Sequence, residues 1–394
     1  MINVVIDFNN VAMRAMNACV YMRDSGVTNY DTQKECGILA RKISTDIAFI
    51  LRTFAPDRVI IVCDAKHPWR EKVYDNIPGM EYKGNRVKDE TKNWTNIFNT
   101  INSLKDIYRS KNCIVTEIEN TEADDLAALY KQKLFDEMGE NVVLVSSDRD
   151  WCQLVDYKSI KDSHSYCIVY NPIANTKGKK KLYLTDGCKN WYDTPEVASI
   201  FFNNYDSDKE AFKSAVKKDS KIEFDVINPV DIVLEKIVCG DDSDNVPGFY
   251  DFYSNGKKTR FTELRMNKLF ESAGIKNYDD FKVSCVNGTI KSYISKLFKR
   301  EINDLDTNER LMRQRKLVEL NPNLFPEKTI SGFNKEVHNI ESSGRLGNTG
   351  IIKMEDLLKG SDYIDEDYVA APRVRTNAIF VDFSDLECFN KSLF

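Results

Sequence analysis

Histidine is scarce in this sequence of 394 residues, which holds only three. His67, His164 and His338 have no histidine or cysteine at the spacing of a metal site, so zinc hydrolases and histidine-based triads are disfavoured. The ten cysteines are scattered without a CxxC pair. This usage is typical of reduced thiols and predicts a cytoplasmic protein. No apolar run reaches about 18 residues and Asp7 interrupts the first one, so neither a membrane partner nor a secretory signal is expected.

A basic excess is also missing, because 61 acidic residues outnumber 56 basic ones and the net charge is −5. Taken alone, this total argues against a nucleic-acid partner. Nine of the acids, however, fall in a few tight clusters, and without them the basic residues are in the majority. The charge of the chain therefore permits a nucleic-acid partner.

Short apolar runs alternate with helical patterns through the first 150 residues. The runs cover residues 2–8, 59–63, 113–118 and 142–148. Continuous apolar runs, without polar alternation, are typical of strands that are buried on both faces. Strands that alternate with helices predict an α/β fold with a mostly parallel sheet.

Several of the clustered acids stand where a predicted strand ends. Asp7, Asp64 and Asp148 each close an apolar run, and the carboxyl ends of parallel strands meet at one edge of a sheet. Acids brought to one edge repel each other unless cations lie between them. Carboxylates without histidine or thiolate favour magnesium or manganese. The remaining acids of the clusters are Glu122, Asp124, Asp125, Asp150, Asp241 and Asp244.

Each cluster also has a simpler interpretation. One acid after a strand is more often a turn residue or a helix N-cap, and TEADD could simply begin a helix. GDDSDN could be a solvated loop or a weak calcium loop. Their occurrence together in one chain favours a metal site. Two magnesium or manganese ions at this site would bind the attacking and the leaving oxygen of a phosphodiester.

The motifs resemble, in their order, those of the flap-endonuclease (5′-nuclease) superfamily. Within it the chain looks most like the phage 5′→3′ exonucleases and, through CDAKHPWRE, the T-even-phage ribonuclease H group. The motifs that carry the resemblance are VIDFNN (5–10), EYKGNR (81–86), EADD (122–125), SSDRDW (146–151) and GDDSDNVPG (240–248).

The resemblance implies a PIN-like nuclease domain with a helical arch, followed by a helix–three-turn–helix region that grips duplex DNA. The expected divisions are a nuclease domain at 1–225, with the arch near 66–111 and an insert near 160–225, a helical domain at 226–330 and an extension at 331–394. The last of these ends FNKSLF, which we expect either to bind a replication partner such as a sliding clamp or to fold back on its own domain.

The resemblance also assigns roles to residues. The nine clustered acids match positions that bind two divalent cations, with Asp148 and Asp150 bridging them. Lys83 and Arg86 match cations that contact the scissile phosphate, and Tyr82 either stacks on a base or packs under the arch. The turn that normally follows GDDSDNVPG is absent, which puts a monovalent-cation site in doubt. Lys257, Lys258 and Arg260 stand there instead as predicted DNA contacts.

The expected function is a metal-dependent 5′-3′ nuclease. Its predicted substrates are DNA duplexes with a flap or nick and RNA–DNA hybrids, with removal of RNA primers in phage replication as the role. Expected partners are a sliding clamp or single-strand-binding protein, in the host cytoplasm. Two alternatives stay open: a PIN-domain ribonuclease acting on single-stranded RNA, and a non-catalytic DNA-structure-binding protein.

Overall fold

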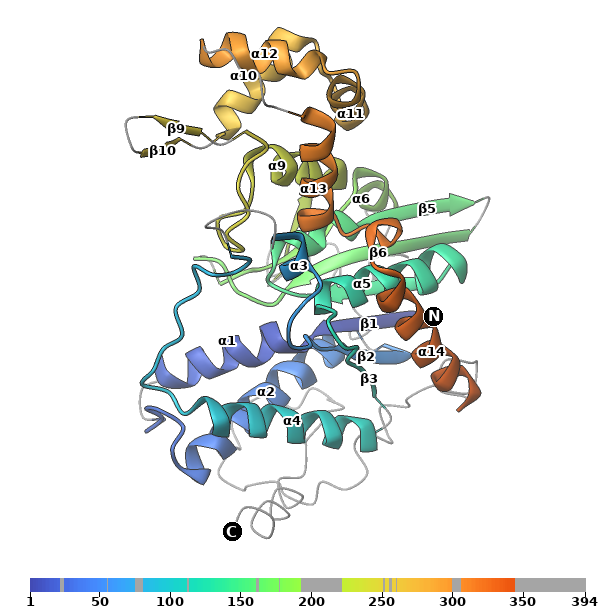
Figure 1. Cartoon of the computed structure of the whole chain (residues 1–394). Helices are drawn as coiled ribbons and strands as arrows, with labels where there is room; N and C mark the ends of the chain where they lie inside the picture. The colour runs from blue at the N-terminus through green and yellow to red at the C-terminus, as the bar shows by residue number, and fades with distance from the viewer. Residues whose placement is uncertain are drawn as a thin grey trace.

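A central sheet with helices on both faces forms the larger part of the structure, and further helices lie beyond one end of it (Figure 1). This computed structural model describes residues 1–21, 25–54, 56–74, 81–111, 113–160, 163–176, 178–192, 222–250, 252–254, 257–259, 261–299 and 306–343. Among the described helices, none is both long and apolar enough to cross a bilayer.

In spatial order, the first five strands of the sheet are parallel to one another, which confirms the predicted α/β fold. Beyond these strands, β7 (Lys180–Leu184) runs antiparallel to β6 (Ser163–Asn171), and β8 (Ile222–Val226) is parallel to β7. The strand β5 (Asp156–Ile160) pairs in antiparallel fashion with the other end of β6. In spatial order the strands are β3 (Ile114–Thr116), β2 (Arg58–Val62), β1 (Ile2–Asp7), β4 (Asn141–Val145), β6 (Ser163–Asn171), β7 (Lys180–Leu184) and β8 (Ile222–Val226), with β5 (Asp156–Ile160) beside β6.

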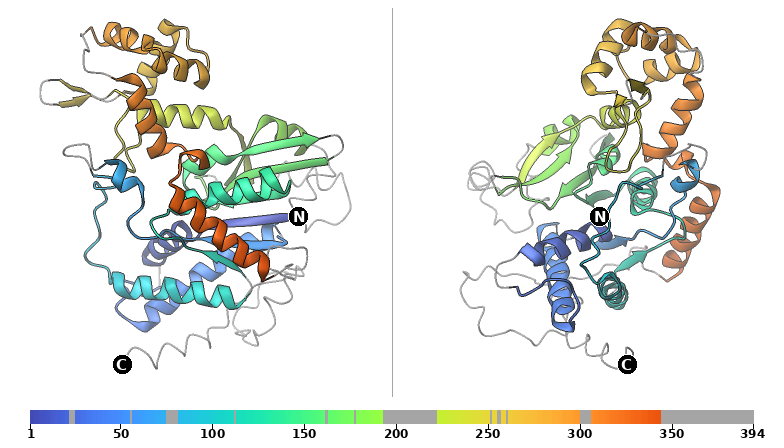
Figure 2. Two further views of the ribbon diagram at one scale, coloured as in Figure 1. Left: turned by 45° about the vertical axis from the view of Figure 1, so that its right-hand side comes forward. Right: turned by 60° about the vertical axis from the view of Figure 1, so that its left-hand side comes forward.

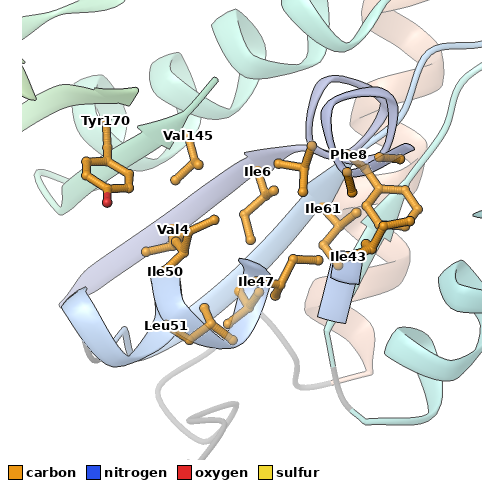
Figure 3. Close-up of a cluster of buried hydrophobic side chains, with 14 of the residues drawn as sticks. Val4, Ile6, Phe8, Ile43, Ile47, Ile50, Leu51, Ile61, Val145 and Tyr170 are labelled. Carbon is orange, nitrogen blue, oxygen red and sulfur yellow. The ribbon is translucent and has the colours of Figure 1, made fainter. Parts of the chain in front are cut away.

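One face of the sheet packs on α1 (Phe8–Tyr21), α2 (Gln33–Phe54) and α4 (Trp94–Ser110). In Figure 3, Val4 and Ile6 of β1 meet apolar side chains of α2. The α2 side chains in this contact recur at helical spacing, which is why the sequence pattern predicted a helix here. They are Ile43, Ile47, Ile50 and Leu51.

The opposite face packs on α5 (Ala123–Lys131) and α14 (Glu327–Ser342). Neighbouring residues of β1 point to opposite faces, so Val5 belongs to this second core, while Val4 and Ile6 belong to the first. Phe333 of α14 packs edge-on against Tyr130 of α5, with ring centroids 4.9 Å apart. The boundary expected between residues 330 and 331 therefore falls within a helix that covers the sheet.

The C-terminal helices form a third core, which includes Phe249, Leu269 and Phe281. Figures 1 and 2 place α10, α11 and α12 at the opposite end of the molecule from α2 and α4. A short hairpin precedes them. The elements of this region are α9 (Pro229–Cys239), β9 (Phe252–Ser254), β10 (Lys257–Thr259), α10 (Glu263–Ala273), α11 (Tyr278–Val286), α12 (Thr289–Phe298) and α13 (Thr307–Val318).

The predicted arch and insert are each described in part. The arch range contains α3 (Arg70–Tyr74) and α4, and α4 buries Ile97 and Leu104 in the first core. The insert extends the sheet through β6, β7 and β8 and contributes α6 (Asp186–Tyr192). Of the predicted positions, Arg260, the FNKSLF end and most of the extension lie outside the described residues.

Candidate active site

Acids from three neighbouring strands converge at one edge of the sheet. Asp7 is the last residue of β1, Asp64 stands two residues after β2, and Asp148 follows β4. Because β2, β1 and β4 are parallel neighbours, their carboxyl ends lie side by side. The start of α5 joins them, since the Ala123 amide donates a 2.8 Å hydrogen bond to Asp64 Oδ1.

The acids are close enough to disturb one another's ionisation. Burial, followed by the charge of Asp64, raises the pKa of Asp7 to about 7. Burial and the charge of Asp148 likewise raise the pKa of Asp150 to about 7, and the same two causes raise that of Asp124 well above its usual value. Five of the predicted residues thus form one electrostatic cluster rather than separate turns.

Hydrogen bonds within the SSDRD turn (residues 146–150) and from it to Asp7 set the geometry of this turn. Asp7 accepts hydrogen bonds from the Asn10 amide (2.9 Å) and from Ser146 Oγ (2.8 Å). Ser146 Oγ in turn accepts from the Asp148 amide at 3.0 Å. Asp148 caps the 3₁₀ turn η2 (Arg149–Leu154) by accepting from the Asp150 amide at 2.9 Å. The turn therefore holds both carboxylates beside the end of β1.

Protein groups bind both carboxylate oxygens of Asp125 in the interior of the protein. Its side chain is fully buried, Trp69 Nε1 donates to Oδ2 at 2.8 Å, and Arg70 Nη2 lies 2.7 Å from Oδ1. Arg70 also binds Glu122 at 2.8 Å and donates to the Leu317 carbonyl. In this arrangement Asp125 anchors the first turn of α5.

The acidic loop after α9, residues 241–245, joins the cluster through Lys236. Lys236 Nζ lies 2.5 Å from Asp150 and also pairs with Asp241. Although burial raises it, the pKa of Asp241 is lowered overall by Lys236 and by hydrogen bonds from Ser243. Lys236 thus joins the SSDRD turn to the acidic loop.

The predicted cations face the same acids. Lys83 pairs with Glu122 and lies 3.6 Å from Asp244, and Arg86 Nη2 lies 2.5 Å from Asp244. Tyr82 is only 7% exposed, and its hydroxyl donates to Glu122 and Asp244 at 3.1 and 3.2 Å. This buried position corresponds to packing under the arch, one of the two roles expected for Tyr82.

Sequence reasoning missed four residues that bind the clustered acids: Trp69, Arg70, Trp151 and Lys236. Trp151 Nε1, for example, donates to Asp124 at 2.6 Å. The signal was present in part, because Trp69 and Arg70 belong to the quoted CDAKHPWRE stretch and Trp151 closes SSDRDW. Lys236 had no such signal, since a lysine on a helix is usually solvated.

The donor chemistry of the cluster fits a hard divalent cation. Its donors are carboxylates, and burial together with neighbouring negative charge raises the pKa values of Asp7 and Asp150. Within the described ranges, no group of three or more histidine, cysteine or acidic side chains has the geometry of a metal site. Protein cations hold several of the carboxylates, so an ion bound to Glu122, Asp150, Asp241 or Asp244 would compete with Lys83 or Lys236.

Comparison with known proteins gives a consistent set of similarities. Residues 3–182 match the 5′-3′ exonuclease N-terminal, resolvase-like domain. No curated protein matches significantly. The fold is similar to that of the bacteriophage T5 5′-exonuclease with bound zinc (TM-score 0.51, 18% identity, 90% of this chain and 100% of that one). It is also similar to that of a T5 flap endonuclease complexed with DNA and metal ions (TM-score 0.50, 17% identity, 87% of this chain and 98% of that one).

Proposed function

We propose that this chain is a member of the 5′-nuclease superfamily and a metal-dependent 5′-3′ nuclease, since its residues 3–182 match the 5′-3′ exonuclease N-terminal domain. It would hydrolyse phosphodiesters near the 5′ end of branched, nicked or RNA–DNA hybrid duplexes. One observation carries the proposal: acids from the ends of β1, β2 and β4 form a single cluster that Lys83 and Arg86 face.

The carboxylates would hold two divalent cations, Mg²⁺ or Mn²⁺, as the resemblance implies. Bound cations of this kind lower the pKa of water and stabilise a leaving oxygen. The residues proposed to hold them are Asp7, Asp64, Glu122, Asp124, Asp125, Asp148, Asp150, Asp241 and Asp244. Glu122 and Asp125 fit this set least directly, because Arg70 binds both of them, and Lys83 and Trp69 bind their other oxygens.

The side chains around this cluster have separable tasks. Asp148 and Asp150 are the proposed bridging ligands, and the proposal is supported by the effect of the Asp148 charge on both Asp7 and Asp150. Lys83 and Arg86 would orient the scissile phosphate and stabilise the charge that develops on it. Lys83 and Arg86 now pair with carboxylates, so a bound phosphate would replace Glu122 and Asp244 as their partner.

The wider substrate range rests on the resemblance. Hybrid-directed cleavage, primer removal and a closer kinship with the T-even-phage group stay predictions, as do the proposed clamp or single-strand-binding partners. The helical region would grip the duplex. Lys257 and Lys258 of β10, together with Arg260, are its proposed contacts, with a monovalent cation as a further proposed cofactor.

A cleavage assay tests the proposal. We would incubate a 5′-labelled flap duplex and a matched RNA–DNA hybrid with magnesium, and then repeat both with a chelator. Release of short 5′ products only in the presence of metal is the expected result, and the ratio of the two rates identifies the preferred substrate. Tight flap binding without turnover would favour the non-catalytic binder. Cleavage of single-stranded RNA alone would favour the PIN-type ribonuclease.

A further inference from the structure

Two segments far apart in the sequence dock on each other at the candidate site. We call residues 81–86 the cation turn, because they carry Lys83 and Arg86, and residues 241–245 the acidic loop. We propose that Asn85 and Asn245 are positioning residues that hold the cation turn on the acidic loop and so fix Lys83 and Arg86 over the carboxylates. The proposal rests on the nuclease function proposed above.

The two asparagines make reciprocal hydrogen bonds across the interface. Asn245 of the acidic loop donates its side-chain amide to the Glu81 carbonyl at 2.8 Å. Asn85 of the cation turn donates its side-chain amide to the Asp242 carbonyl at 2.6 Å. Between these bonds, the Lys83 backbone amide donates to the Asp244 carbonyl at 3.0 Å. Each segment thus satisfies backbone groups of the other.

The backbone of both segments is shaped for this contact. Lys83 has a φ of 57° and Asn245 a φ of 60°, and both angles lie in the left-handed region. Asparagine adopts this conformation readily, whereas lysine does so at a cost. The turn is also tight, since a Cβ on Gly84 would lie 2.7 Å from Glu81 Cβ. Strained conformations persist where surrounding contacts enforce them, and docking on the acidic loop supplies such contacts.

The charge pair of Lys83 with buried Glu122 holds the middle of the cation turn, but the pair of Arg86 with Asp244 does not by itself explain the position of its end. The Arg86 side chain is 57% exposed, and exposed ion pairs add little to stability because water screens them. Buried Tyr82 anchors the start of the turn, but Arg86 lies four residues further on. Bonds from Asn85 and Asn245 to backbone carbonyls cover this distance; they are exposed as well, but they are directional and hold the backbone itself.

Two variants remove the amides with little other change. Asn245→Gly deletes the side chain while keeping a residue that accepts a positive φ. Asn85→Ala deletes the second amide. Asn96→Ala is the matched control, because Asn96 also donates its side-chain amide to a distant carbonyl, that of Tyr30 at 2.9 Å, but on α4.

We expect both site variants to lower the single-turnover cleavage rate of the flap duplex by about tenfold or more, since small misplacements of catalytic groups are costly. The magnesium concentration for half-maximal rate, the thermal midpoint and flap affinity should stay near wild type, and Asn96→Ala should cleave normally. Arg86→Ala should lower the rate less in the Asn245→Gly background than in the wild type, because the two residues act together.

Hydrogen exchange gives a readout that is independent of activity. In Asn245→Gly, the Lys83 amide should exchange faster, while amides of β1 should exchange as in the wild type. Wild-type cleavage rates in both variants, or unchanged exchange at Lys83, would overturn the positioning role while leaving the nuclease function in place. A wild-type protein that cleaves neither flap nor hybrid with magnesium would instead refute the proposed function, and this inference with it.

Discussion

We expect Arg70→Met to destabilise the protein by about 3–5 kcal/mol, the usual effect of removing one partner from a buried ion pair. Arg70 is almost fully buried and lies 2.8 Å from Glu122 and 2.7 Å from Asp125. The variant would leave Asp125 buried without its cation and Glu122 with Lys83 alone, and the Leu317 carbonyl would lose its hydrogen bond from Nε. Methionine keeps much of the side-chain volume, so most of the loss would be electrostatic.

Urea-induced unfolding at pH 7.5 measures this effect, and a chelator keeps stray cations from replacing the guanidinium. Arg109→Met serves as control, because Arg109 pairs with Asp106 on the surface and should contribute under about 1 kcal/mol. Adding Asp125→Asn to Arg70→Met should recover part of the loss, since one unpaired charge is then removed. A change within about 1 kcal/mol for Arg70→Met would refute the reasoning.

Three further predictions concern ionisation and catalysis. Asp148→Asn should stop cleavage while unfolding and flap binding stay near wild type; cleavage at the wild-type rate would contradict the site assignment. Glu35 has its pKa lowered to about 2, against burial, by hydrogen bonds from Thr28 and Thr32. Glu35→Gln should therefore destabilise the protein by about 1–2 kcal/mol at pH 7, and the difference should shrink as the pH falls from about 4.5 towards 2; urea titrations that show a constant difference would contradict this. Magnesium should raise the melting temperature more at pH 8 than at pH 5.5, because Asp7 and Asp150, whose pKa values are raised to about 7, ionise between these values and lower the stability of the metal-free protein. Equal increments in scanning fluorimetry would contradict that expectation.

The strands and the convergence of their terminal acids could be predicted because both follow from local pattern. A strand buried on both faces has a continuous apolar run at its centre, which made β1, β2 and β4 visible in the sequence. Parallel pairing then brings their carboxyl ends together without further information. The position of Asp7 beside Asp64 and Asp148 is thus a consequence of topology.

The partners of these acids could not be predicted in the same way. Lys236 and Asp150 are far apart in the chain, as are Asn245 and Glu81, and the contact between such segments depends on how loops and helices pack. The strands of the insert were also hidden. In β8 the apolar residues alternate with acids, and β7 begins with two lysines, so neither forms the continuous apolar run that marked the central strands.

The protein cations explain how so many acids can share one edge of a folded sheet. Buried carboxylates without partners would either destabilise the fold or take up protons. Arg70 compensates Glu122 and Asp125, and Lys236 compensates Asp150 and Asp241. Asp7 accepts hydrogen bonds and interacts electrostatically with Arg14, but it forms no ion pair with a described residue, and burial and the charge of Asp64 raise its pKa to about 7. The charge left without compensation therefore lies around the end of β1, where a divalent cation would gain the most.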